Sequence, residues 1–283
     1  MYTTLISATQ LASIIEQPSS VILDCRHDLM DANLGLSAYA AGHLPRAQFA
    51  HMDQHLSGSK LAADGSFKGR HPLPDKEQFL QCLRAWGINE DTQVIAYDAH
   101  GGMYAARLWW MLRWVGHAAV AVLDGGLAAW SKQGLALAQN SPQSVPGAIQ
   151  ALPSLVNQVN VEQVLANLET AAKLVVDARS PDRYRGENES MDPVGGHIPG
   201  AKNRFFKDNL QADGSFKSAQ QLQQEWSALL TDSSKAIMQC GSGVTACHNL
   251  LALEVAGLSG ASLYPGSWSE WCAHAERPVA LGS

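Results

Sequence analysis

Residues 235–257 read KAIMQCGSGVTACHNLLALEVAG, and this stretch decides the fold class. It begins with a short, nearly all-apolar run, continues through a glycine-rich turn, and ends as a segment with apolar residues at i, i+3 and i+4 spacing that stops at Gly257. An all-apolar run of this length is typical of a strand buried on both faces of a sheet, and the segment that follows has a helical period. The stretch therefore predicts one strand–turn–helix unit of an α/β protein, in which helices cover both faces of a parallel sheet.

The same unit occurs a second time, as QVIAYDAHGGMYAARLWWMLRWVG over residues 93–116. Other paired stretches keep the same order along the chain: VILDCRHD (21–28) with LVVDARSPD (174–182), GHLPRAQF (42–49) with GHIPGAKNRF (196–205), DGSFK (64–68) with DGSFK (213–217), and DGGLAAW (124–130) with PGSWSEW (265–271). Such order predicts a tandem duplication. We expect an N-terminal copy over 1–138, a proline-containing extended linker over 139–153, and a C-terminal copy over 154–283.

Composition excludes several classes of protein. The chain has 283 residues, of which 46% are hydrophobic and 16% charged, so it can fill a core and is not disordered. A net charge of −6 without a run of Lys or Arg argues against a nucleic-acid partner. We expect no membrane partner, because no stretch approaches the roughly 18 apolar residues that cross a bilayer, and no signal peptide, because the N-terminus lacks a basic region.

The cysteine pattern predicts the compartment and argues against metal. Five cysteines with no paired spacing indicate free thiols in a reducing cytoplasm, and neither CxxC nor HExxH occurs. We therefore expect no metal and no organic cofactor.

Ligands of parallel α/β sheets bind beyond the carboxyl ends of the strands. That position holds Asp98 in the first copy and Cys240 in the second. In the second copy, Gly241 and Gly243 can adopt positive φ, so that successive backbone N–H groups turn inward as an anion-binding nest. This pattern predicts an active C-terminal copy and an inactive N-terminal one.

The helix that begins near Thr245 strengthens the prediction, because its unpaired N–H groups and positive dipole end lie beside the turn. Ser242 and Thr245 add hydroxyl groups. A cysteine in such surroundings is held as a thiolate. We therefore predict that Cys240 is an activated sulfur nucleophile.

The motifs GHLP, GHIPGA, LDGGLAAW, LYPGSWSEW and CGSGVTA resemble those of the tandem-domain rhodanese-like sulfurtransferases over nearly the whole chain. The resemblance implies two rhodanese-like domains, each a five-stranded parallel sheet flanked by helices, with catalysis in the C-terminal copy. In this family the loop cysteine takes the outer sulfur of a donor as a persulfide and passes it to a nucleophilic acceptor. The implied acceptors are cyanide and thiols, such as a thioredoxin-like protein or a low-molecular-weight thiol.

The neutral loop CGSGVT is similar to that of the 3-mercaptopyruvate group, whereas thiosulfate enzymes of the family tend to carry cations, as in CRKGVT. The predicted donor is therefore 3-mercaptopyruvate, with thiosulfate as the alternative. Arg183 matches the family's substrate-binding arginine and could hold a carboxylate by two hydrogen bonds. The sequence departs from the group at the position of a second arginine, which is Asp192; Arg185 or Arg70 could substitute.

The resemblance also assigns further site residues. The predicted donor-binding loop consists of Gly241, Gly243, Val244 and Thr245. Ser242 is expected to handle protons with a histidine and an aspartate. His43 matches the histidine by its GHLP context, although His197 has the same context, so that a shared packing role is equally open. Asp28 or Asp31 could be the aspartate, whereas the Asp24–Arg26 and Asp177–Arg179 spacings predict structural pairs.

Three other functions fit the sequence less well. A Cdc25-type phosphatase needs an arginine within the loop after the cysteine, and residues 241–246 contain none. A non-catalytic rhodanese module usually loses the cysteine that this chain retains. A redox sensor would pair Cys240 with Cys247, about two helical turns away, where a disulfide is geometrically unfavourable.

Overall fold

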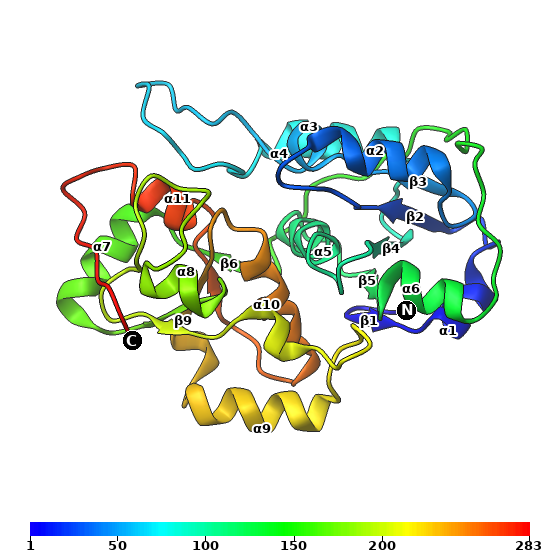
Figure 1. Ribbon diagram of the computed structural model, residues 1–283. Helices are drawn as coiled ribbons and strands as arrows, with labels where there is room; N and C mark the ends of the chain where they lie inside the picture. Colours follow the sequence, from blue (N-terminus) through cyan, green and yellow to red (C-terminus); the bar gives the residue numbers. More distant parts are fainter. The chain divides into compact units, whose positions relative to one another are not determined.

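The computed structural model describes all 283 residues, which form two compact units (Figure 1). Unit 1 consists of Met1–Gly58, Pro74–Leu155 and Leu210–Phe216, and unit 2 of Ser59–Leu73, Val156–Asn209 and Lys217–Ser283. The predicted copies supply most of each unit. Two segments differ from the predicted division, because 59–73 packs in unit 2 and 210–216 in unit 1.

Each unit contains a five-stranded sheet in which all paired strands are parallel. In unit 1 the order is β1-β5-β4-β2-β3, with β1 Leu5–Ile6, β2 Ser20–Asp24, β3 Ala47–Phe49, β4 Gln93–Tyr97 and β5 Val120–Leu123. In unit 2 it is β6-β10-β9-β7-β8, with β6 Asn157–Gln158, β7 Leu174–Asp177, β8 Lys202–Asn203, β9 Ala236–Gln239 and β10 Ser262–Leu263. The prediction of two helix-flanked five-stranded parallel sheets is confirmed.

Helices flank both sheets, as Figure 1 shows. Those of unit 1 are α1 Ala8–Ile14, α2 Ala32–Ala41, α3 Met52–His55, α4 Lys76–Ala85, α5 Ala105–Trp114 and α6 Gly126–Lys132. Those of unit 2 are α7 Val161–Thr170, α8 Pro181–Arg185, α9 Ala219–Leu229, α10 Thr245–Val255 and α11 Ser267–Trp271, with short 3-10 helices η1 Phe206–Asn209 and η2 Ser233–Lys235. All but two residues of α10 are buried, which explains the apolar character of the segment that follows the glycine-rich turn.

The two aspartate–arginine pairs have the structural role predicted for them. Arg26 donates to Asp24 at 2.6 Å, and Arg179 donates to Asp177 at 2.6 Å. Each guanidinium also donates to the carbonyl of the glycine in the following Gly-His motif, at 2.8 and 2.7 Å. Each pair therefore connects the end of an interior strand, β2 or β7, to the loop that precedes the neighbouring edge strand, β3 or β8.

The linker 139–153 contains no helix or strand, but hydrogen bonds and burial hold it against its neighbours. Its Gly147 N–H donates to the carbonyl of Arg84 at 2.8 Å, and Ile149 is 2% exposed with its N–H on the carbonyl of Ile88. The extended linker therefore packs within unit 1.

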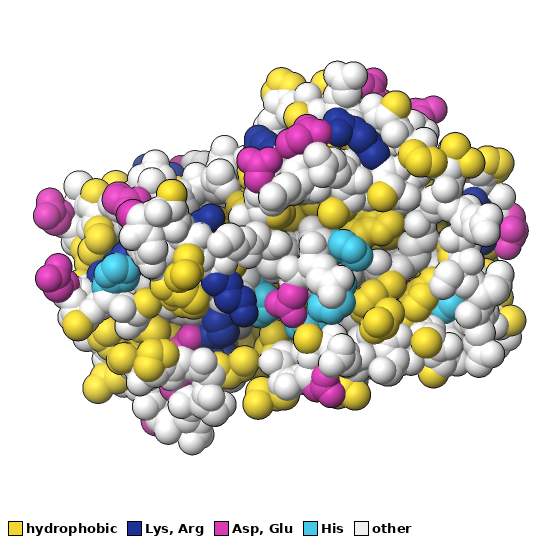
Figure 2. All heavy atoms as spheres, turned by 90° about the horizontal axis from the view of Figure 1, so that it is seen from above, with side chains coloured by type: hydrophobic (Ala, Val, Ile, Leu, Met, Phe, Trp, Pro, Cys, Tyr) yellow, Lys and Arg dark blue, Asp and Glu magenta, His cyan; other side chains and the backbone are white.

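Charges of both signs are interspersed on one face of the molecule. On the face drawn in Figure 2, Lys and Arg side chains lie singly or in small groups among neutral and acidic ones. This face presents no extended basic surface of the kind that binds nucleic acid. None of the helices has the length and apolar content needed to cross a membrane.

Candidate active site

Cys240 lies where β9 ends and the turn into α10 begins, and it is 2% exposed. Its backbone N–H donates to Ser267 Oγ at 3.1 Å, and its carbonyl accepts from the N–H of Trp268 at 2.9 Å. Ser267 Oγ in turn donates to the carbonyl of Tyr264 at 2.9 Å. The cysteine is thereby held between the central strand and the start of α11. Ser267 was not found from the sequence, because its role depends on this packing.

The two loop glycines are required for different reasons. Gly243 has a φ of +76°, as predicted, and an added Cβ would lie 2.4 Å from the carbonyl oxygen of Pro265. The prediction of positive φ is wrong for Gly241. There the reason is space, because a Cβ would lie 2.7 Å from Arg70 Nη2 and 3.5 Å from Arg183 Nη2. Gly241 therefore lets two guanidinium groups approach the backbone next to Cys240.

The corresponding turn in unit 1 shows how such a loop holds an anion. The Asp98 carboxylate is fully buried and accepts hydrogen bonds from the N–H groups of His100, Gly102, Tyr104 and Ala105, at 2.7 to 3.0 Å. Four amides of the turn and helix start thus surround one negative charge, as expected of a nest. The duplicated strand–turn–helix unit supports the prediction that the loop after β9 suits a thiolate.

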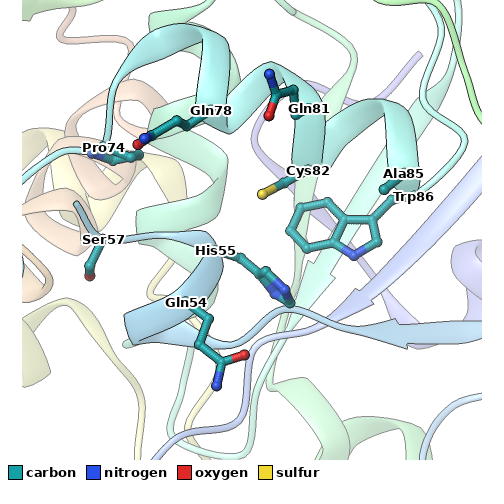
Figure 3. Close-up of a pocket in the computed structure, with 9 residues that line it drawn as sticks. All are labelled: Gln54, His55, Ser57, Pro74, Gln78, Gln81, Cys82, Ala85 and Trp86. Carbon is teal, nitrogen blue, oxygen red and sulfur yellow. The ribbon is translucent and has the colours of Figure 1, made fainter. Parts of the chain in front are cut away.

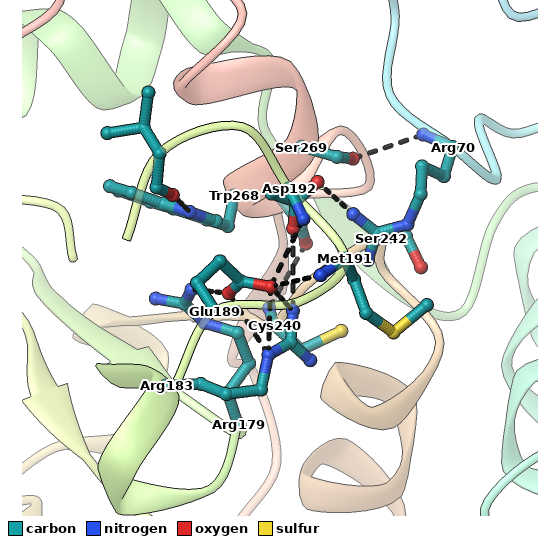
Figure 4. A network of polar contacts seen from close by, with 12 residues as sticks. Arg70, Arg179, Arg183, Glu189, Met191, Asp192, Cys240, Ser242, Trp268 and Ser269 are labelled. Carbon is teal, nitrogen blue, oxygen red and sulfur yellow. Dashed lines mark hydrogen bonds and ion pairs between the residues drawn. The ribbon is translucent and has the colours of Figure 1, made fainter. Parts of the chain in front are cut away.

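Three arginines and two carboxylates form a network beside Cys240 (Figure 4). Arg183 in α8 donates to both oxygens of Glu189, at 2.8 and 3.0 Å, and Arg179 Nη1 lies 3.3 Å from Glu189 Oε2. Asp192 pairs with Arg70 and lies 3.4 Å from Arg183 Nη2. The predicted donor-binding Arg183 is therefore part of a cluster of paired arginines and carboxylates, and Arg70 belongs to the same cluster.

The two carboxyl groups of the network respond differently to burial. Burial opposes ionisation of Glu189, but the hydrogen bonds from Arg183 and from the N–H of Met191, together with the positive charges of Arg183 and Arg179, outweigh it and hold the pKa of Glu189 below its ordinary value. Burial raises the pKa of Asp192 in spite of Arg70 and Arg183. Asp192 is thus the less readily ionised of the two.

Ser242 has a partner that the sequence did not single out. Its Oγ lies 2.8 Å from Nδ1 of His71, and both side chains are buried. His71 follows Arg70 in the segment GRHPLP, directly after the first DGSFK, whereas the second DGSFK is followed by SAQQLQ. This difference between the copies is the signal that could have found His71.

His43 lies in unit 1 with both ring nitrogens near main-chain carbonyls, those of Tyr39 at 2.8 Å and Asn140 at 3.3 Å. Its ring stacks on Tyr39 at 4.0 Å, and His197 stacks on Tyr184 at 3.8 Å in unit 2. The matching arrangements favour a shared structural role, and a catalytic role of His43 stays a prediction. The candidate aspartates accept local backbone N–H groups in a turn and a helix cap: Asp28 and Asp31.

The remaining candidates lie apart from the network. Arg185 pairs with exposed Glu187 at 2.7 Å. Cys247 is buried, with Sγ 3.3 Å from the carbonyl of Gly243, and all five cysteines are free. Trp268, by contrast, does contact the network, because the Arg179 guanidinium carbon lies 4.7 Å from the centre of its fully buried ring.

Unit 1 contains a separate cavity of about 520 Å³, which Figure 3 shows. Its lining includes Cys82 and His55. Burial raises the pKa of Cys82 and lowers that of His55, so both are held neutral. No lysine or arginine lines the cavity. It therefore lacks a counter-ion for an anionic donor, and no group of His, Cys, Asp or Glu in the chain is arranged to hold a metal ion.

Comparison with known proteins agrees with this geometry. A model of the rhodanese-like domain matches residues 7–133 and again 160–274. A Pseudomonas aeruginosa protein named probable 3-mercaptopyruvate sulfurtransferase is 44% identical over 281 residues, 98% of either chain. Thiosulfate sulfurtransferase of Mus musculus is 34% identical over 96% of this chain and 92% of its own. The crystal structure of SseA from Escherichia coli, described as a 3-mercaptopyruvate sulfotransferase, superimposes with a TM-score of 0.81 and 32% identity, covering 95% of this chain and 100% of its own.

The duplicated parallel sheets and the cysteine loop after β9 define a tandem α/β protein with one cysteine-centred site. The family model matches both halves of the chain, which therefore belongs to the rhodanese-like family. The resemblance predicted from its motifs is confirmed.

Proposed function

We propose that this chain is a sulfurtransferase that moves sulfur from 3-mercaptopyruvate to a thiol or to cyanide through a persulfide on Cys240. The observation that carries the proposal is the approach of the Arg70 and Arg183 guanidinium groups to Gly241, the residue next to Cys240. They supply a place for the donor's carboxylate within reach of the sulfur nucleophile. The relatives named for 3-mercaptopyruvate support this choice of donor.

In the first half-reaction, the Cys240 thiolate attacks the sulfur of the donor. A sulfur–sulfur bond forms and the carbon–sulfur bond breaks, so its electron pair leaves with carbon as the enolate of pyruvate. Backbone N–H groups of residues 241–245 and the α10 N-terminus stabilise the anionic sulfur before and after the transfer. In the second half-reaction, an acceptor thiolate attacks the outer sulfur and Cys240 leaves as a thiolate.

The enolate must gain a proton to become pyruvate. Ser242 Oγ, bonded to His71 Nδ1 at 2.8 Å, can donate it, and His71 can supply the proton that Ser242 loses. In this role we place His71 rather than His43, whose ring nitrogens lie on main-chain carbonyls.

The direct test is the intact mass of the protein after incubation with 3-mercaptopyruvate. We expect a gain of one sulfur, about 32 Da, that disappears on addition of cyanide, because cyanide removes the outer sulfur of a persulfide. A protein that gains no sulfur from this donor would disprove the proposal.

Thiosulfate is the second candidate donor, because two guanidinium groups could also hold a dianion. Comparison of kcat/KM for the two donors, with cyanide as the acceptor, distinguishes them. We expect the higher value for 3-mercaptopyruvate, since carboxylates of the protein already pair with the arginines and offset their charge.

Replacement of Arg183 by alanine should raise the KM for 3-mercaptopyruvate by roughly tenfold or more, because a charge-assisted pair of hydrogen bonds to the carboxylate is lost. Steady-state kinetics measures this effect. Arg204→Ala is a matched control, since that arginine pairs with Glu225 away from the loop. An unchanged KM in Arg183→Ala would remove the assignment.

Replacement of His71 by alanine should lower kcat by roughly a hundredfold, the usual effect of losing a general acid or base, and change KM less. The rate of pyruvate release measures it. His197→Ala serves as a comparison for a stacked structural histidine. A kcat equal to that of the unmodified protein would exclude His71 from proton transfer.

We infer a thiol acceptor, either a thioredoxin-like protein or a low-molecular-weight thiol, and a place in the cytoplasm. Five free cysteines are in keeping with a reducing compartment.

A further inference from the structure

Arg70 is brought to the cysteine loop by a fixed backbone. It belongs to the segment 59–73 of unit 2, and its N–H donates to Ser269 Oγ in α11 at 3.1 Å. Its Nη1 pairs with Asp192, and its Nε is buried without a hydrogen-bond partner. A buried N–H group without a hydrogen-bond partner costs free energy. We therefore expect an arginine that has such a group beside a nucleophile to bind a ligand.

The N–H groups with no partner face the loop. Of Arg183, Nε and Nη2 are held by Glu189 and Asp192, while Nη1 has no partner and lies 3.7 Å from the Cβ position of Gly241. Of Arg70, Nη2 has no partner and lies 2.7 Å from the same position. Gly241 directly follows Cys240 in the chain. An anionic donor group bound by these two guanidinium groups would therefore lie next to the cysteine.

Asp192 connects the two guanidinium groups. Its two oxygens face different arginines, one Arg70 and the other Arg183, and its side chain is 3% exposed (Figure 4). Around the loop, the guanidinium and carboxylate groups are equal in number: Arg70, Arg179 and Arg183 against Asp177, Glu189 and Asp192. The cluster is therefore formally neutral, although it offers free N–H donors.

We propose that Arg70 is the second donor-binding cation of this site and that Asp192, as a positioning residue, holds Arg70 and Arg183 in place and limits the site to a singly charged anionic group. This inference rests on the proposed function. A neutral cluster with free N–H groups can bind one carboxylate by directed hydrogen bonds. The same cluster binds a compact dianion such as thiosulfate less well, because a dianion needs an excess of positive charge.

The test measures kcat and KM for 3-mercaptopyruvate and for thiosulfate, with cyanide as the acceptor. Arg70→Gln should raise the KM for 3-mercaptopyruvate about tenfold, since a charged hydrogen-bond donor is lost. Arg185→Gln is the matched control, because Arg185 pairs with exposed Glu187 and should leave both KM values unchanged. Arg70→Lys, which keeps the charge and loses the forked geometry, should give an intermediate KM even if Arg70→Gln folds poorly.

Asp192→Asn tests the charge limit. Removing one negative charge should raise kcat/KM for thiosulfate about tenfold relative to 3-mercaptopyruvate, because the site becomes net positive. If Asp192 had a purely structural role, its replacement would change kcat/KM by the same factor for both donors. An unchanged ratio between the donors, or a KM in Arg70→Gln and Arg70→Lys equal to that of the unmodified protein, would overturn this inference.

Sulfur loading of the unmodified protein distinguishes failure of this inference from failure of the proposed function. If it gains sulfur from 3-mercaptopyruvate while the Arg70 variants keep its KM, only this inference fails. If it gains no sulfur from 3-mercaptopyruvate, the proposed function fails and this inference with it.

Discussion

Cys240→Ser should abolish sulfur loading by either donor while leaving the fold intact. Serine has nearly the same size, so the buried position beside Ser267 and the backbone bonds of Cys240 can remain. A hydroxyl is not ionised near neutral pH and cannot form a persulfide, so the expected rate is that of the uncatalysed reaction. Intact mass should show no gain of sulfur, and circular dichroism should match that of the unmodified protein.

Two further cysteine variants make this result specific. Cys82→Ser changes a half-buried cysteine in unit 1 and should load sulfur normally. Cys247→Ser tests the redox alternative, in which Cys247 would resolve an oxidised Cys240. Sulfur loading that persists in Cys240→Ser, or that is lost in Cys82→Ser, would show that the nucleophile has been assigned wrongly.

Asp98→Ala should be the most destabilising single change in unit 1 outside its apolar core. The substitution removes the acceptor of four backbone N–H groups in a site without exposure to solvent. A buried polar group left without its partner costs about 1–3 kcal/mol, and the N–H donors of Gly102, Tyr104 and Ala105 belong to buried residues, so we expect a loss of about 3–5 kcal/mol. Urea unfolding followed by tryptophan fluorescence measures the loss, since Trp109 and Trp110 lie in the adjoining α5.

Asp64→Ala provides the comparison for Asp98→Ala. Asp64 also accepts backbone and side-chain hydrogen bonds, but it is exposed, in the DGSFK turn. Exposed groups exchange their partners for water, so the expected loss of stability is much smaller than that of Asp98→Ala. Equal stability of the two variants would mean that the amides around Asp98 do not depend on its charge.

Asp98 also explains why one copy is expected to be inactive. Its carboxylate occupies the nest that would otherwise receive a substrate anion, and it bears no nucleophilic sulfur. The same strand–turn–helix unit thus has a structural use in unit 1 and, as we propose, a chemical use in unit 2. The contrast depends on one side chain, Asp98 in place of Cys240.

Much of the fold was predictable because its signals are local. Buried parallel strands are apolar throughout, helices have a fixed period, and the duplicated motifs place each element twice. The same local pattern of strand, glycines and helix predicts the position of Cys240. Arg183 was predictable because the family motif around it is contiguous.

The environment of the cysteine was not predictable, because it is made by segments far apart in the chain. His71 and Ser242 are separated by 171 positions, and Arg70 reaches Asp192 over 122. No periodicity relates such residues, so the sequence did not place Arg70 rather than Arg185 beside the loop. The one signal for His71, that GRHPLP has no counterpart after the second DGSFK, does not place that histidine beside Ser242. The need for glycine at 241 likewise became clear only from the arginines that pack on it.

The amino-acid sequence by itself therefore determines the two parallel sheets and the duplication, and it predicts the residue that we propose as the sulfur nucleophile, since each depends on neighbours within one strand–turn–helix unit. The tertiary structure alone decides which charges and which histidine stand beside that sulfur. The physical reason is that packing, and not local conformational preference, brings the segment 59–73 against α11 and the cysteine loop.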